Sequence, residues 1–247
     1  MVKSFILMIQ FLTRLPIKKQ IEMERDTLAK GTLFFPLVGI IIGSIAGIVY
    51  YLLNFINSDL ASFGAVFAIV FTTGGLHVDG LSDTADGFFS GRSREKVLEI
   101  MKDSRVGSFG VIAIVFILLL KYILIRSLPY SFVLKTLILS CGISRLGASF
   151  LFSFGKSAKP GGLGNMFTGK DSIKYLIISF IIFTSIGFLI EKAIFAISLI
   201  TVFTFDLFLM KYSYRMIGGF TGDVYGAAIE LGEVVSIFTF LVVRLWI

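Results

Sequence analysis

The sequence has few charged residues, one cysteine and one histidine. Charged residues make up 16% of its 247 positions, whereas a soluble domain carries roughly a quarter, so a water-soluble globular surface is excluded. The single cysteine, Cys141, excludes an intrachain disulfide, and its place in an apolar run indicates a small core residue. One histidine and one cysteine are also too few for an ordinary zinc site, which uses several such ligands.

The sequence contains long runs of apolar residues. Hydrophobic residues make up 56% of the chain, and its mean hydropathy is +0.92. Runs of about 20 residues can cross a hydrocarbon layer about 30 Å thick, and backbone groups in lipid favour helices. We therefore predict an all-α polytopic membrane protein, a single integral membrane domain over residues 1–247, with about six or seven spanning helices and short amphipathic helices. Seven candidate spans cover roughly residues 33–56, 60–78, 107–125, 131–153, 174–190, 193–210 and 227–246.

The net charge of +7 reflects cations whose positions along the chain indicate the membrane topology. Most of them lie in four segments: the residues before the first span and the loops 79–106, 154–173 and 211–226. Alternating spans place all four segments on the same side of the bilayer, and an excess of Lys and Arg marks the cytoplasmic side. We therefore expect the acidic and glycine-rich loops on the cytoplasmic face, and we expect no nucleic-acid partner.

Three aspartates follow the second predicted span. Asp79, Asp83 and Asp86 are spaced i, i+4 and i+7, which places three carboxylates on one face of a helix. Their repulsion is increased beside lipid, and a bound divalent cation relieves it. Oxygen ligands favour Mg²⁺ as the cofactor. The alternative is an acidic turn neutralised by water and by the nearby Arg92 and Arg94.

The residues around this motif suit a phosphate-bearing substrate. Asp103 supplies a fourth carboxylate, and Arg105 is a bidentate donor for phosphate. His77 lies two residues before the first aspartate and fits a base, a ligand or a polar cap at the interface. The candidate metal ligands are Asp79, Asp83, Asp86 and Asp103, and the candidate catalytic residues are Asp83, Asp86, His77 and Arg105.

Two glycine-rich loops and one buried cation complete the candidate site. Exposed backbone N–H groups in glycine-rich turns can hold phosphate, although a flexible connector has the same composition. Arg145 lies inside a predicted span and needs a partner there, which is either a substrate phosphate or a structural ion pair. The candidate substrate-binding residues are Arg92, Arg145, Gly162, Gly164, Gly219, Gly222, Asp223 and Glu230.

Gly39, Gly43 and Gly47 recur at every fourth position of the first predicted span. This spacing allows two helices to pack closely. We favour packing within the chain. The same pattern occurs in helix dimers, so a homo-oligomer remains the alternative.

Several blocks along the chain resemble one family. They are Thr13-Arg14-Leu15-Pro16, Phe35-Pro36 with Gly39, the stretch 73–87, Leu98 to Arg105 with Gly107, Ser144-Arg145, Gly162-Leu163-Gly164 with Phe167, and Gly219 to Asp223 with Glu230 and Glu233. In order and spacing these blocks resemble the cobalamin synthases, or adenosylcobinamide-GDP ribazoletransferases. The resemblance implies a magnesium-dependent enzyme of the prokaryotic inner membrane. Such an enzyme joins adenosylcobinamide-GDP to α-ribazole, or its 5′-phosphate, and releases GMP.

Two other classes of membrane protein compete with this interpretation. A CDP-alcohol phosphotransferase uses similar metal chemistry, but it should show Asp-Gly-x-x-Ala-Arg, and Ala-Arg is missing after Asp79-Gly80. A transporter should place its polar residues in the middle of the membrane, in broken helices of paired halves. Here the polar residues collect at one edge, which favours phosphoryl transfer.

Overall fold

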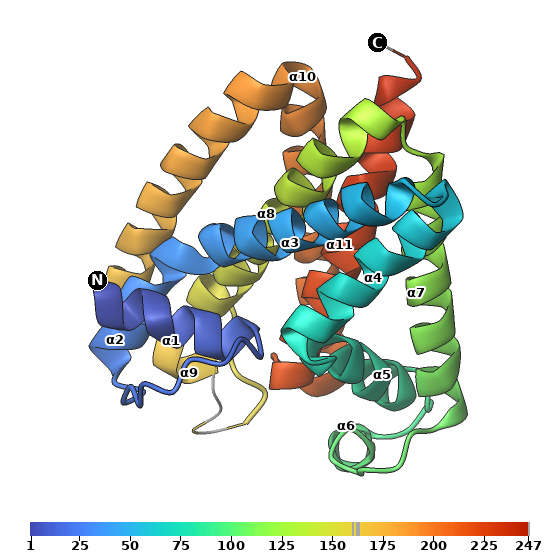
Figure 1. Cartoon of the computed structure of the whole chain (residues 1–247). Coiled ribbons are helices and arrows are strands. Elements are labelled where there is room, and N and C mark those ends of the chain that lie inside the picture. Colours follow the sequence, from blue (N-terminus) through green and yellow to red (C-terminus); the bar gives the residue numbers. More distant parts are fainter. Residues whose placement is uncertain (160, 162–163, 247) are drawn as a thin grey trace.

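The structure is a computed structural model that describes residues 1–159, 161 and 164–246, and its architecture is helical (Figure 1). The described part of the chain contains no strand, only an isolated bridge between Ser157 and Phe220. In chain order its elements are α1 (Val2–Leu12), α2 (Arg25–Gly31), the 3-10 turn η1 (Thr32–Phe34), α3 (Phe35–Asn54), α4 (Ser58–Thr73), α5 (Leu76–Phe88), α6 (Arg94–Ile100), α7 (Ser108–Ser127), α8 (Tyr130–Phe154), α9 (Gly164–Phe167), α10 (Lys170–Ile217) and α11 (Gly222–Arg244).

The membrane-spanning architecture is confirmed. Among the described residues, five helical stretches are long and apolar enough to cross a bilayer, and the bent pair α4 and α5 brings the count to six. Helix α10 has 48 residues, far more than one crossing needs. Its backbone leaves the helical conformation at Glu191 and Lys192, where Figure 1 shows a sharp bend between two arms. These arms correspond to the predicted spans 174–190 and 193–210.

The predicted span 60–78 was wrong at its carboxyl end. Helix α4 stops at Thr73, because Gly74 and Gly75 adopt φ angles of +63° and +71°. This left-handed conformation is easy for glycine and strained for other residues. Helix α5 then starts at Leu76 and is bent by 88° from α4. The acidic motif therefore lies on a separate helix.

The glycines of α3 pack against α8. A Cβ atom on Gly39 would lie 2.2 Å from the carbonyl oxygen of Cys141, and one on Gly43 would lie 2.4 Å from that of Leu137. Only glycine allows backbones to approach this closely. Packing within the chain is thus confirmed as the role of this spacing. Helix α8 is the most buried of the candidate spans and contacts α3, α10 and α11.

The basic segments meet at one end of the bundle, which is the lower end in Figure 1. The backbone N–H of Ala158 donates to the carbonyl of Phe220, and Arg94 Nη2 donates to the carbonyl of Ala158 at 3.2 Å. Arg25 Nη2 donates to the carbonyl of Thr168 at 3.0 Å. These contacts connect all four basic segments and confirm that they lie on the same face.

Candidate active site

Helix α5 packs closely against the start of α11. A Cβ atom on Gly80 would lie 2.8 Å from the carbonyl oxygen of Asp223, and one on Gly226 would lie 3.3 Å from the backbone of His77. The two glycines therefore let the helices approach until their polar residues lie side by side. The acidic stripe of α5 and the first turn of α11 form one cluster at the basic end of the bundle.

Three carboxylates of this cluster form no ion pair with a described cation. Asp83 lies close enough to Asp79 and Asp223 for each to repel its charge. Asp223 accepts a hydrogen bond of 3.1 Å from Thr221, which also caps α11. Among the described residues, no Lys or Arg forms an ion pair with any of the three aspartates. We call Asp79, Asp83 and Asp223 the acidic cluster.

Asp86 faces a different partner from the other acids of α5. Its carboxylate accepts hydrogen bonds from the backbone N–H groups of Gly107 at 2.7 Å and Gly110 at 2.9 Å. These groups lie at the start of α7, where a carboxylate satisfies free donors and the helix dipole. Asp86 therefore fastens α5 to α7. Its assignment as a ligand or catalytic residue stays a prediction.

Asp103 and Arg105 pair with each other on the surface. The Arg105 side chain donates to both carboxylate oxygens of Asp103, at 3.0 and 2.6 Å. These bonds and one from the Arg105 backbone lower the pKa of Asp103 to about 2. Arg92 lies exposed in the turn after α5. The roles predicted for all three residues in metal or phosphate binding stay predictions.

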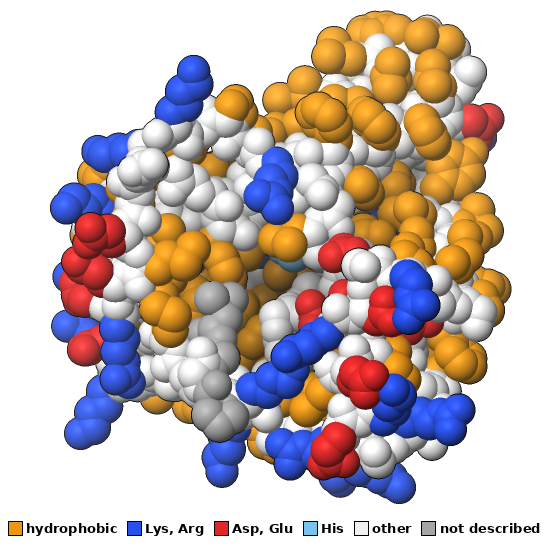
Figure 2. Space-filling model, turned by 90° about the horizontal axis from the view of Figure 1, so that it is seen from below, with side chains coloured by type: hydrophobic (Ala, Val, Ile, Leu, Met, Phe, Trp, Pro, Cys, Tyr) orange, Lys and Arg blue, Asp and Glu red, His pale blue; other side chains and the backbone are white. Residues whose placement is uncertain are grey.

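Two hollows flank the acidic cluster, and Gly222 and Asp223 line both. The apolar hollow, of about 170 Å³, is lined mainly by hydrophobic and aromatic side chains, together with His77 and Asp79. The basic hollow, of about 210 Å³, is lined in part by Lys102 and Lys159. Figure 2 looks onto this end and shows the recess between acidic and basic side chains. The site thus offers an apolar compartment and a cationic one, joined at Asp223.

Lys102 and Lys159, the cations of the basic hollow, were not predicted as site residues from the sequence. Burial and the neighbouring Lys102 lower the pKa of Lys159, and the nearby carboxylate of Asp223 opposes this shift. Gly164 also lines this hollow, whereas Gly162 lies outside the described residues. Gly219 instead allows the backbone at Lys156 to come close. The excess of Lys and Arg in the basic loops was interpreted only as a sign of topology. The same excess is also a signal for phosphate binding.

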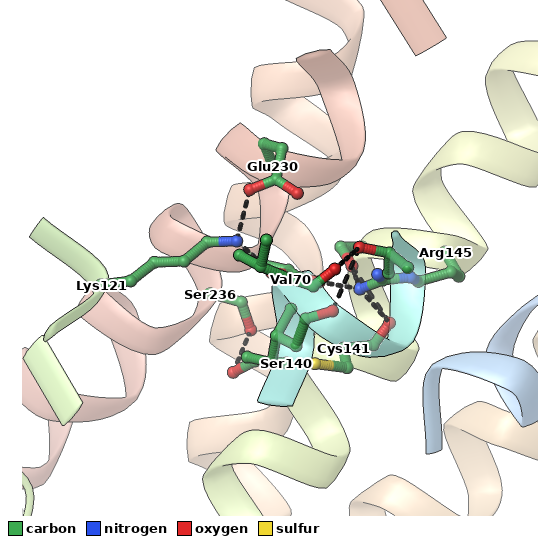
Figure 3. A network of polar contacts seen from close by, with 11 residues as sticks. Val70, Lys121, Ser140, Cys141, Arg145, Glu230 and Ser236 are labelled. Carbon is green, nitrogen blue, oxygen red and sulfur yellow. Dashed lines mark hydrogen bonds and ion pairs between the residues drawn. The ribbon is translucent and has the colours of Figure 1, made fainter. Parts of the chain in front are cut away.

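Four charged side chains form a separate network inside the bundle (Figure 3). Lys121 on α7 contacts Glu230 at 2.5 Å and also Glu233, both on α11. Arg145 on α8 pairs with Glu233 and donates to Ser144 at 3.1 Å. All four charged side chains are fully buried. We call Lys121, Glu230, Glu233 and Arg145 the core network.

The core network bears on two predicted substrate-binding residues. Of the two partners considered for Arg145, the structure shows the structural ion pair. Glu230 is paired in the same way with Lys121. Binding of substrate by either residue stays a prediction. Lys121 was not recognised from the sequence, although a lone cation within an apolar span is a signal for a buried partner.

Comparison with known proteins supports one family. Residues 4–241 match the family model described as cobalamin-5-phosphate synthase. The chain belongs to this family. An adenosylcobinamide-GDP ribazoletransferase of Clostridium novyi is 44% identical over 97% of this chain and 96% of the relative. Proteins of the same name from Clostridium tetani (41% identical over 97% of this chain and 95% of the relative) and Thermoanaerobacter pseudethanolicus (37% over 99% of each) are also similar. No solved structure matches the chain.

This result confirms the resemblance to the cobalamin synthase family that the motifs indicate. The match covers both hollows and the core network. The geometry described above therefore belongs to the region that defines the family.

The core network makes a prediction for stability. Lys121→Met leaves two buried carboxylates with one cation, so we expect the free energy of unfolding to fall by about 3–5 kcal/mol. The double variant Lys121→Met/Glu230→Gln removes one charge of each sign, and its loss should be smaller than the sum of the single losses. Thermal unfolding of the protein in detergent measures both.

Lys96→Met is the matched control, because Lys96 forms an exposed pair with Glu99 and such pairs contribute little. Equal stabilities of Lys121→Met and Lys96→Met, or additive losses in the double variant, would contradict the role of the core network.

Proposed function

We propose that the protein is an adenosylcobinamide-GDP ribazoletransferase, which joins adenosylcobinamide-GDP to α-ribazole or its 5′-phosphate and releases GMP. Relatives with this name match nearly the whole chain at 37–44% identity. The structural observation that carries the proposal is the acidic cluster between the apolar and the basic hollow. The family assignment does not favour a CDP-alcohol phosphotransferase or a transporter.

The reaction is a substitution at phosphorus. A ribose hydroxyl of the acceptor attacks the phosphorus nearer cobinamide, the new O–P bond forms, and the bond to the GMP phosphate breaks. Because the acceptor can carry a phosphate at its 5′ position, the attacking hydroxyl is another one. Lys102 and Lys159 neutralise the diphosphate in the basic hollow. Asp223, which lines both hollows, accepts the proton of the hydroxyl.

Magnesium is the cofactor that fits this site best. Among the described residues, no three His, Cys, Asp or Glu side chains are grouped as a complete metal site. Mg²⁺ usually takes only one or two carboxylates and fills its shell with water and substrate phosphate. Asp79 and Asp83, close together and without a cationic partner, meet that need. When bound, the ion would supply positive charge to the diphosphate and the departing GMP.

The localisation follows from charge and topology. We propose that the protein spans the prokaryotic cell membrane with the acidic cluster facing the cytoplasm, because the basic segments gather at that end of the bundle. The native thiol, Cys141, is buried, so an introduced cysteine can be labelled selectively.

We expect a membrane-impermeant thiol reagent, added to intact cells, to label Ser127→Cys but not Ser93→Cys. Both serines are exposed, and they lie at opposite ends of the bundle. Lysed cells, in which both variants should react, provide the control. Labelling of Ser93→Cys in intact cells would reverse the proposed orientation.

A transfer assay tests the activity itself. Purified protein in detergent, given adenosylcobinamide-GDP, α-ribazole and Mg²⁺, should form cobalamin and GMP in equal amounts. Asp83→Asn should lower kcat by about 100-fold or more without changing thermal unfolding, because it removes a charge that the site uses.

Glu99→Gln, an exposed acid on α6, is the matched control and should keep full activity. The absence of product with folded wild-type protein would contradict the proposed function. Full activity of Asp83→Asn would remove Asp83 from the reaction.

A further inference from the structure

We propose that the apolar hollow binds the aromatic base of the acceptor riboside, and that His77 donates a hydrogen bond to a ring nitrogen of that base. The inference rests on the proposed function and adds the position of one substrate to it. It concerns a binding role for His77, in contrast to the catalytic role for which the sequence makes His77 a candidate.

The walls of the apolar hollow suit an aromatic ring. Phe152 and Tyr225 line it and stack on each other, with ring centroids 3.6 Å apart and planes 15° apart. Phe220 also stacks on Tyr225, with ring centroids 4.8 Å apart, and lines the basic hollow. An apolar cavity of about 150 Å³ holds a benzene ring. At about 170 Å³, the apolar hollow has room for a flat base.

His77 supplies the polar recognition. Its side chain lines the hollow, is only 3% exposed, and has no hydrogen-bond partner for Nδ1 among the described residues. Leaving a buried polar group unpaired costs about 1–3 kcal/mol. A neutral imidazole has one N–H donor and one acceptor. In an azole base, the ring nitrogen that does not carry the sugar accepts a hydrogen bond. This nitrogen can therefore pair with the N–H donor of His77.

The charges of the two hollows indicate that adenosylcobinamide-GDP, the other substrate, binds in the basic hollow. Among the described residues that line the apolar hollow there is no Lys or Arg. A diphosphate needs cationic side chains around it, whereas a neutral ring does not. The diphosphate therefore belongs in the basic hollow with Lys102 and Lys159. Asp223 lies where the ribose hydroxyl of one substrate meets the phosphate of the other.

Filling the hollow provides the first test. Leu76 lies at its edge and is 42% exposed, so Leu76→Trp adds volume without disturbing the core. We expect the KM for α-ribazole to rise about tenfold or more and the KM for adenosylcobinamide-GDP to stay within about twofold. Leu60→Trp, on the far end of α4 and 37% exposed, is the control and should change neither KM.

An analogue of the acceptor provides the second test. With the free ring nitrogen replaced by carbon, the analogue should be used about tenfold less efficiently than α-ribazole by the wild type. His77→Phe should use both acceptors equally poorly, and His77→Asn, which keeps an N–H donor, should recover part of the discrimination. Should the His77 variants fail to fold, Leu76→Trp alone decides.

An unchanged KM for α-ribazole in Leu76→Trp overturns the assignment, and so does a rise confined to adenosylcobinamide-GDP. Undiminished discrimination in His77→Phe overturns the role of His77. Wild-type protein without transfer activity would instead contradict the proposed function. In that case, equilibrium dialysis measures the binding of α-ribazole to the hollow. Binding by the wild type that is lost in Leu76→Trp supports the assignment, and no binding by the wild type overturns it.

Discussion

An ionised group carried into this helical bundle needs a partner there, because packed helices and lipid provide no water. The chain meets this constraint in two ways. In the core network, Lys121 and Arg145 compensate Glu230 and Glu233 within the protein. In the acidic cluster, at the end of the same bundle, no described cation forms an ion pair with Asp79, Asp83 or Asp223, and Lys159 acts on Asp223 only from a greater distance. The difference separates charges that support the fold from charges that we propose for the binding of substrate and metal ion.

Helix α11 connects the two charged regions. Asp223 lies in its first turn, and Glu230 lies seven residues later on the same face. The ion pairs of Glu230 and Glu233 hold α11 against α7 and α8, and the close contact at Gly80 holds its start against α5. The buried ion pairs therefore fix the position of Asp223 between the two hollows. Rigid support of this kind is what a site for two substrates requires.

Part of this arrangement could be predicted because it depends on local sequence. Apolar length and cation distribution predicted the spans and the shared face of the basic loops, and the spacing of Asp79 and Asp83 predicted their common helix face. The remaining features depend on distant partners. Asp86 bonds to backbone groups 21 and 24 residues away, and Lys121 pairs with acids more than 100 residues later. Helical periodicity carries no information about such contacts. The bend after α4 was missed because the apolar pattern continues through its two glycines.

The acidic cluster forms no ion pair with a described cation, and we propose that it binds a hard divalent cation instead. Binding of Mn²⁺, followed by the loss of its free-ion electron paramagnetic resonance signal, tests this most directly. The account predicts that wild-type protein with adenosylcobinamide-GDP binds Mn²⁺, that Mg²⁺ displaces it, and that Asp79→Asn/Asp83→Asn abolishes the binding. Glu95→Gln/Glu99→Gln, which removes two exposed acids of α6, should bind normally. Equal binding by the wild type and the Asp79→Asn/Asp83→Asn variant, or no binding by either, would contradict the account.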